Sequence, residues 1–227
     1  MRPLAYITLA FAPLIAFGIY WYFRNRYDAS FRKLLIKSFV AGAFMIIILA
    51  FVQFLSTILG LNDLRSLKRT LFYAFLTIGF TSEFCKFVVL RYIILPKKII
   101  AKPIHAITFS IMIALGLVMM RLILFFLNPF PTESLHAPPT LFPFIAVPAS
   151  IMFAVILGFF IGMSKFVKTR SFYSFTGLMV AAFFNGLFNF CLIANDFKLL
   201  SLFAFGATIL VFILGLKAAY TDPESLQ

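Results

Sequence analysis

The chain has 227 residues, of which 63% are hydrophobic and only 12% are charged, and its mean hydropathy is +1.06. Polar side chains are too few to cover the surface of a water-soluble globule, so the composition excludes that class and predicts an integral membrane protein. The net charge of +13 raises nucleic-acid binding as an alternative. The basic residues lie beside the ends of apolar stretches and form no nucleic-acid-binding motif. Anionic lipid headgroups are therefore favoured over nucleic acid as their partner.

Seven apolar stretches are long enough to cross about 30 Å of hydrocarbon as helices. Residues 44–51, for example, are apolar at every position and not at alternate positions, which excludes the strands of a transmembrane barrel. We therefore predict an all-α polytopic membrane protein with about seven transmembrane helices in one bundle, forming a single domain over residues 1–227. The predicted spans are approximately 4–23, 38–60, 71–95, 104–127, 144–164, 173–194 and 199–219.

The distribution of basic residues predicts the orientation of the chain. The first span follows Arg2 and resembles a secretion signal, but no small-residue cleavage site precedes Arg24, so we expect the span to be retained. Because successive spans run in opposite directions, the connections alternate between the two sides of the membrane. One side receives Arg24, Arg26, Arg32, Lys33, Lys37, Lys97, Lys98, Lys102, Lys165, Lys168, Arg170 and Lys217. The other receives Arg2, Arg65, Lys68, Arg69 and Lys198.

The positive-inside rule then predicts an amino terminus outside and a carboxyl terminus in the cytoplasm, in a bacterial inner membrane. The cluster between Arg65 and Arg69 argues against this orientation. The longest connection, residues 128–143, is rich in proline, which forbids a helix and predicts a stiff external segment. A plain connector is favoured over a lid or docking site for this segment.

Polar residues on four different spans are predicted to lie at similar depth in the membrane. Glu83 and Lys86 are three positions apart, so they share a helix face, and the same holds for Asn185 and Asn189 at a spacing of four. Arg121 keeps its charge and needs a carboxylate, carbonyls or water at that depth. We expect it to pair with Glu83, directly or through water or an asparagine. The predicted polar core is Glu83, Lys86, Arg121, Ser150, Asn185 and Asn189.

This polar layer has two interpretations from the residue types. One is a catalytic or ion-binding centre, because ionisable groups at membrane depth usually mark a function. The other is a polar clasp that fixes helix packing in a medium where hydrophobic force between helices is absent. The residue types alone favour the clasp.

Four motifs follow one another along the chain, in residues 81–87 (TSEFCKF), 103–121, 150–158 and 185–190. Together they resemble the PrsW family of intramembrane proteases, which is related to the CAAX-protease-like membrane families. The first resembles the family's Glu-Glu-x-x-Lys-Phe signature and the second its Pro-x-Asp and Gly-Phe-Ala-x-x-Glu-Asn segments. The third resembles its His-x-x-x-Thr-x-x-x-Gly helix and the fourth its His-Gly-x-x-Asn helix. The similarity covers about residues 71–195. It implies a PrsW-like helical core, and a site where carboxylates and histidines hold a metal or activate water to cleave peptide bonds.

The chain departs from the family at most of the polar positions. The family's first glutamate, its aspartate, its second-helix glutamate and its two histidines correspond, in that order, to Ser82, His105, Arg121, Ser150 and Asn185. The matching positions are Glu83, Lys86, Gly186 and Asn189. The chain therefore lacks most of the side chains that would carry out the family's chemistry.

The residues that remain do not suit a metal. A hydrolytic zinc site needs about three protein ligands from His, Glu, Asp or Cys, whereas the predicted depth offers Glu83 and Cys85, with His105 and His136 near opposite membrane faces. Arg121 would also place a fixed positive charge where the family has an acid. We therefore expect no metal, no cofactor and no catalytic residue. The vestigial-site candidates are Glu83, Lys86, Ser150 and Asn185.

The leading hypothesis is a catalytically inactive PrsW-like protein, a pseudoprotease, that acts as a scaffold, an assembly subunit or a client-binding protein. Its partners would be transmembrane segments of other proteins, bound in a helix groove, and anionic lipid on the cytoplasmic side. A second hypothesis is an active PrsW-type protease with an unconventional site built on Glu83. A third is a component for small-molecule or ion transport, but the inverted symmetry and broken spans that would support it are not found.

Overall fold

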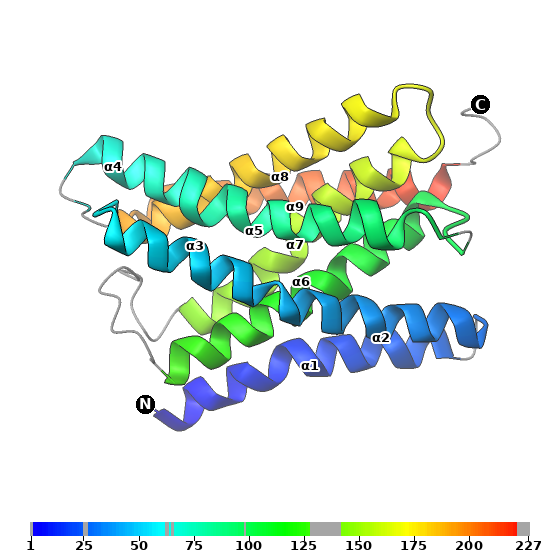
Figure 1. Ribbon diagram of the computed structural model, residues 1–227, viewed down its shortest axis with the longest axis horizontal. Coiled ribbons are helices and arrows are strands. Elements are labelled where there is room, and N and C mark those ends of the chain that lie inside the picture. The colour runs from blue at the N-terminus through cyan, green and yellow to red at the C-terminus, as the bar shows by residue number, and fades with distance from the viewer. Residues whose placement is uncertain are drawn as a thin grey trace.

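The computed structural model describes residues 2–24, 27–61, 64, 66–97, 99–127 and 142–221. All regular secondary structure in these ranges is helical, which confirms the prediction of an all-α polytopic membrane protein. Within the same ranges, six helices are long and apolar enough to cross a membrane, and α1 (Arg2–Arg24) is a further long helix. The long helices run back and forth along the molecule, so that their ends gather at its two opposite ends (Figure 1).

The remaining helices follow α1 in chain order. The second span consists of α2 and α3, which meet at Met45, and the third is a continuous run of four short helical segments, two of them π-helical and labelled η. The bounds are α2 (Ala29–Phe44), α3 (Ile46–Ile58), α4 (Leu67–Phe72), η1 (Tyr73–Phe80), α5 (Thr81–Val88), η2 (Val89–Ile94), α6 (Pro103–Leu127), α7 (Phe142–Ser164), α8 (Arg170–Ile193) and α9 (Phe197–Tyr220).

The second helix begins nine residues before the predicted span, at Ala29 instead of residue 38. The extra residues include Arg32 and Lys33, which are good helix formers but are too polar for the hydrocarbon. The apolar pattern marks the part of a helix that suits the membrane, whereas the helix itself continues past that part. The predicted proline-rich connection of residues 128–143 falls almost entirely outside the described residues.

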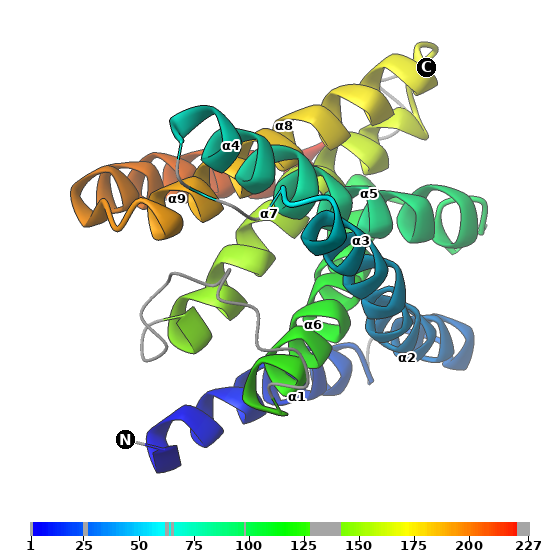
Figure 2. The ribbon, with the colours of Figure 1, turned by 60° about the vertical axis from the view of Figure 1, so that its left-hand side comes forward.

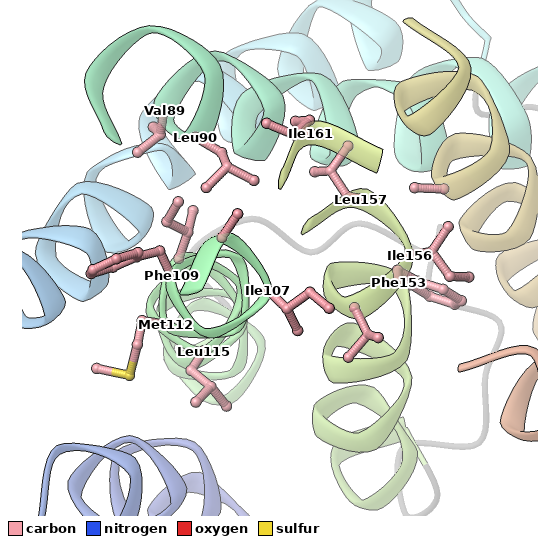
Figure 3. Packing of buried hydrophobic residues seen from close by; sticks show 14 of the residues in the cluster. Val89, Leu90, Ile107, Phe109, Met112, Leu115, Phe153, Ile156, Leu157 and Ile161 are labelled. Atoms are coloured by element: carbon pink, nitrogen blue, oxygen red, sulfur yellow. The ribbon is translucent and has the colours of Figure 1, made fainter. Parts of the chain in front are cut away.

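Helices α6 and α7 form the centre of the molecule. They pack against each other, with α2 on the other side of α6 and α8 on the other side of α7, and Figure 2 shows both crossing the middle of the bundle. Figure 3 shows apolar side chains filling the space around them, including Phe109, Phe153 and Leu157. Small residues allow close approach here: a Cβ atom added to Gly116 would collide with the backbone of Phe39 on α2.

A lysine side chain links neighbouring segments at the end of the bundle where α7 ends. The Lys165 ammonium donates hydrogen bonds of 2.9 Å to the carbonyl oxygens of Lys97 and Ile100. Partial burial lowers the pKa of Lys165, because it disfavours the charged form. Beside it, the Arg91 guanidinium donates to the hydroxyl of Ser164 at 3.0 Å. Basic side chains at this end therefore tie the third span to α7.

Candidate functional site

The site is built around α5, the short α-helical segment between the two π-helical segments η1 and η2. A π-turn bonds residue i to residue i+5, as in the 2.8 Å bond from the Leu95 amide to the Leu90 carbonyl. Such turns are uncommon and often occur at functional sites, because they change the direction in which nearby side chains point. The segment between them carries Ser82, Glu83 and Lys86, all of which are buried.

Two glycines bring the third span against α8. A Cβ atom added to Gly79 would lie 2.7 Å from the backbone nitrogen of Gly186, and one added to Gly186 would lie 2.9 Å from the Cα atom of Phe75. These distances are too short for any larger residue without movement of one backbone. The close approach lets the short side chain of Asn185, next to Gly186, reach across to α5.

A hydrogen-bonded network joins α5 to α8. The Asn185 amide nitrogen donates to Glu83 Oε1 at 2.6 Å and to Ser82 Oγ at 2.9 Å. Asn189 in turn donates to Asn185 Oδ1 at 2.7 Å and to the Asn185 carbonyl at 2.8 Å. The Lys86 ammonium forms a salt bridge with Glu83 Oε1. Both donor hydrogens and the acceptor oxygen of the Asn185 amide are thus engaged, which fixes its orientation.

Glu83 and Lys86 form an ion pair that is almost completely removed from solvent, with relative exposures of 0% and 2%. Burying two charges is costly, and their attraction repays the cost only when the remaining polar atoms are also satisfied. Here Glu83 Oε1 accepts from both Lys86 and Asn185, while Glu83 Oε2 is buried and has no hydrogen-bond partner among the residues that the structure describes. Lys86, three residues from Glu83 on the same helix face, supplies the cation of this pair.

A small, partly open cavity lies beside this network, with about 20 Å³ of space for the centres of water molecules, enough for about one. Residues from α3, α5, α6, α7 and α8 line it. The polar lining residues are Ser82, Lys86, Arg121, Ser150 and Asn185, and the apolar ones are Leu49, Ala114, Leu117, Val118, Ala146, Ala149, Phe153 and Phe188. The structure therefore brings the residues predicted on four spans to one place, with Glu83 and Asn189 directly behind them.

Other candidates lie elsewhere. His105 is near the start of α6, where its Nδ1 atom accepts from the Ala101 amide at 3.4 Å and its Nε2 atom lies 3.0 Å from the hydroxyl of Tyr27. Neither it nor the buried Cys85 lines the cavity. His136 lies outside the described residues.

The sequence analysis missed Tyr73, which is buried on η1 near Arg121. A tyrosine inside an apolar stretch usually needs a partner for its hydroxyl. The position of Tyr73 within such a stretch was the sequence signal that could have identified it. It also missed the pairing of Gly79 with Gly186. The only hint was two glycines in spans that both carry polar residues.

The polar side chains at this site do not supply the ligands that a hydrolytic metal needs. Such a metal needs about three protein ligands with free lone pairs, and the described part of the chain contains no group of three His, Cys, Asp or Glu residues that could hold one. The Lys86 ammonium and the Asn185 amide already occupy Glu83 Oε1. A metal at Oε1 would have to displace both donors, and Glu83 Oε2 would supply only one of the three or so ligands that are needed.

Comparison with known proteins agrees with the motifs. A family model described as PrsW family intramembrane metalloprotease matches residues 31–216. The chain is 25% identical to Protease PrsW of Geobacillus kaustophilus (strain HTA426), over 84% of this chain and 80% of the relative. It is 24% identical to Protease PrsW of Clostridioides difficile (strain 630), over 81% and 77%, and 25% identical to that of Bacillus subtilis (strain 168), over 84% of each.

No solved structure matches the chain at a significant level. The family match covers most of the chain and includes every helix of the site. It also confirms the resemblance seen in the motifs on α5, α6, α7 and α8. The chain is an integral membrane protein that belongs to the PrsW family.

Proposed function

We propose that this chain is a catalytically inactive member of the PrsW family, a pseudoprotease that binds transmembrane segments of other membrane proteins. The observation that carries the proposal is the state of Glu83, the acid that matches the family signature. One of its oxygens is occupied by Lys86 and Asn185. The neighbouring positions that the family fills with carboxylates or histidines hold Ser82, Arg121 and Asn185, which add positive charge and amide donors instead of metal ligands.

Binding of a client rests on what the family does and on the shape of the centre. A protease that acts within the membrane must hold a protein segment there, and the loss of its chemistry leaves the surface that holds the segment. The cavity between α5, α6, α7 and α8 keeps apolar walls, including Leu117, Phe153 and Phe188. The cavity itself has room for about one water molecule, so we infer that a client would lie along the helix surfaces around it, and that the protein acts as a scaffold, an assembly subunit or a client-binding protein.

The test measures transition metals in the purified protein, in a non-ionic detergent, beside a variant that restores two family residues, Arg121→Glu with Asn185→His. We expect no stoichiometric zinc in the parent and a gain of zinc in the variant. About one zinc per chain in the parent, lost in Glu83→Gln, would overturn the proposal. The matched control is Arg170→Glu with Asn195→His, which makes the same changes at exposed positions.

One observation favours an active protease as the second candidate. Glu83 Oε2 is buried and meets no hydrogen-bond partner in the described part of the chain, so this oxygen could bind a water molecule as a general base. The candidate predicts cleavage of a single-span client that Glu83→Gln abolishes without lowering the unfolding temperature. If the protein is a pseudoprotease, deletion of its gene should cause no uncleaved client to accumulate. Affinity purification of the protein from native membranes should then yield a membrane-protein partner in stoichiometric amount.

We also propose that the protein resides in a bacterial inner membrane, because the curated relatives above are bacterial. Basic residues are concentrated at the end of the bundle that holds Lys97, Lys165 and Arg170. Such residues attract anionic lipid headgroups on the cytoplasmic side. This end would then face the cytoplasm together with the carboxyl terminus.

A further inference from the structure

We propose that an open cleft between α4 and the end of α8 binds one acyl chain of an anionic phospholipid, whose phosphate lies beside the basic residues of α4. The cleft is separate from the central cavity, and none of its described lining residues belongs to the hydrogen-bonded network around Glu83. A lipid site here is independent of whether the chain cleaves peptide bonds.

The cleft opens where two helices that touch deeper in the bundle move apart. The backbones of η1 and α8 meet at Gly79 and Gly186, with no space for a side chain between them. About 10–14 Å further along the two helices, Thr70 and Ile193 line the cleft from its two sides. Both spans end here, at Leu67 and Ile193, and these helix ends lie at the same end of the molecule (Figure 1). The mouth of the cleft is therefore at the depth where lipid chains meet their headgroups.

The size and the walls of the cleft suit a hydrocarbon chain. The cleft has about 440 Å³ of space for the centres of water molecules, whereas the central cavity has about 20 Å³. Most of its described lining is apolar, including Leu67 and Phe190. The hydroxyl of Thr70 donates to the Ser66 carbonyl at 3.1 Å, so its hydrogen is not offered to the cleft. Water in this space would leave the apolar walls hydrated, whereas an acyl chain would bury them.

A lipid chain fits this cleft better than a transmembrane segment of another protein does. The lining comes from residues 64–70 and 190–195, so it extends only about 10 Å along each helix. A transmembrane segment crosses about 30 Å of hydrocarbon, and the cleft would meet only a third of it. A single acyl chain can enter at the mouth and fill the whole cleft.

The charges at this end of the bundle favour an anionic headgroup. Lys68 and Arg69 directly follow the lining residue Leu67, and both are exposed. Lys198 near the start of α9 is a third exposed cation, whereas the carboxylate of Asp196 caps α9. Basic residues therefore outnumber acidic ones around the mouth of the cleft, as far as the structure describes it. Basic side chains beside a membrane surface attract anionic lipids.

An anionic lipid would also give a role to a cluster that opposes the predicted orientation of the chain. Arg65, Lys68 and Arg69 belong to a connection that the other basic residues place outside the membrane, where the positive-inside rule disfavours them. A ligand that needs positive charge accounts for basic residues on that side. The basic residues proposed above to face the cytoplasm lie at the opposite end of the bundle, so the two groups can be tested separately.

The experiment places a fluorescent reporter in the cleft and measures its quenching by brominated lipid. The chain has a single tryptophan, so Trp21→Phe with Phe190→Trp leaves one emitter, at a lining position. The full chain is reconstituted in bilayers of dioleoyl phosphatidylcholine. These bilayers contain the same small fraction of either phosphatidylglycerol or phosphatidylcholine that is brominated on its acyl chains. We expect both lipids to quench the reporter, and phosphatidylglycerol to bind about tenfold more strongly.

Two pairs of substitutions in this reporter chain locate the headgroup. Lys68→Gln with Arg69→Gln should make the two lipids bind about equally at the cleft. Lys168→Gln with Arg170→Gln removes the same two charges from exposed positions at the opposite end of the bundle, and should leave the preference at about tenfold. All four positions are exposed, so these variants are expected to fold, which circular dichroism verifies.

A second reporter shows what a lipid-facing position without the cleft does. Trp21→Phe with Phe212→Trp places the emitter on α9, where the side chain is 67% exposed, and should show no preference between the two lipids. If Phe190→Trp fails to fold, Ile193→Trp supplies the emitter at another lining position.

Three results would overturn the inference: equal binding of the two lipids at the cleft, the same preference at both reporters, or an equal loss of preference in both pairs of charge variants. Absence of quenching at the cleft would also overturn it, because a protein segment and not an acyl chain would then occupy the space. Loss of the preference on addition of dissolved glycerol 3-phosphate would show that the basic residues bind a free phosphate and that the acyl chain is not needed.

Discussion

Asn185 on α8 donates a hydrogen bond of 2.6 Å to the carboxylate of Glu83 on α5, 102 positions earlier in the chain. The family motif has a histidine at the position of Asn185. A neutral histidine offers a nitrogen lone pair to a metal, whereas an amide nitrogen offers only hydrogens. The one lone-pair atom of this amide, Oδ1, accepts from Asn189 and is turned away from the acid. Under the proposed function, an asparagine at the position that the resemblance assigns to a ligand acts instead as a donor that holds the carboxylate in place.

The ion pair of Glu83 and Lys86 predicts an asymmetric response to mutation. Lys86→Met leaves a buried carboxylate without its cation, so we expect a loss of about 3–5 kcal/mol in the free energy of unfolding. Glu83→Gln with Lys86→Met removes both charges and should recover most of that loss. Unfolding of the purified protein in detergent, followed by circular dichroism, measures both effects.

Lys68→Met is the matched control for this experiment, because Lys68 is exposed near the start of the same span. Its effect should stay within about 0.5 kcal/mol, as is usual for surface substitutions. If Lys86→Met were no more harmful than Lys68→Met, the burial of the ion pair would be contradicted.

The contact between Gly79 and Gly186 predicts that a single methyl group will disturb the site. In Gly79→Ala, the new Cβ atom would start 2.7 Å from the Gly186 nitrogen, so η1 and α8 must separate. We expect a loss of about 1–3 kcal/mol in stability, the usual cost of overpacking. The strained separation would also lengthen the bond between Asn185 and Glu83.

Gly206→Ala on α9 supplies the control, since a Cβ atom there would meet nothing within 4 Å. Alanine is the better helix former, so this variant should be as stable as the parent or more stable by up to about 1 kcal/mol. The close packing of η1 and α8 would be refuted if both alanine variants unfolded at the same temperature.

The helical class and most of the helix positions could be predicted from the sequence because hydrocarbon imposes one strong rule on every span, namely that apolar residues must continue for about 20 positions. The rule does not mark helix ends in water, which is why the start of α2 at Ala29 was missed. It also does not reveal a π-turn, since η1 is as apolar as the α-helical spans.

The members of the site could be predicted better than their pairing. Depth along each span identified Glu83, Lys86, Arg121 and Asn185, because a polar group in a span is rare enough to stand out. Which cation meets Glu83 depends on helix rotation and on side-chain length, neither of which the sequence fixes. Lys86 needs no rotation because it lies three residues from Glu83 on the same face, whereas Arg121 would have to reach from α6.

The hydrogen bond between Tyr27 and His105 predicts a modest structural role for His105, whose position resembles that of an aspartate in the family motif. The two side chains are 3.0 Å apart and link the turn before α2 to the start of α6. Tyr27→Phe should lower stability by about 0.5–1.5 kcal/mol, the net value of one hydrogen bond, measured by thermal unfolding. Tyr92→Phe, at an exposed ring, should have no measurable effect, and equal losses in both variants would show that the bond contributes nothing.

The arrangement of helix ends predicts the sidedness of the chain in the membrane. The ends of η2, α7 and α9 gather at one end of the bundle, and those of α3 and α8 at the other (Figure 1). With basic residues concentrated at the first end, a fluorescent protein fused after Gln227 should fluoresce in the cytoplasm, and alkaline phosphatase at the same position should be inactive. Phosphatase fused after Leu64, between α3 and α4 in the chain, should be active on the outer side. Immunoblots of each fusion control for its amount, and the reverse pattern at both sites would mean that Lys68 and Arg69 outweigh the larger basic group in setting the orientation.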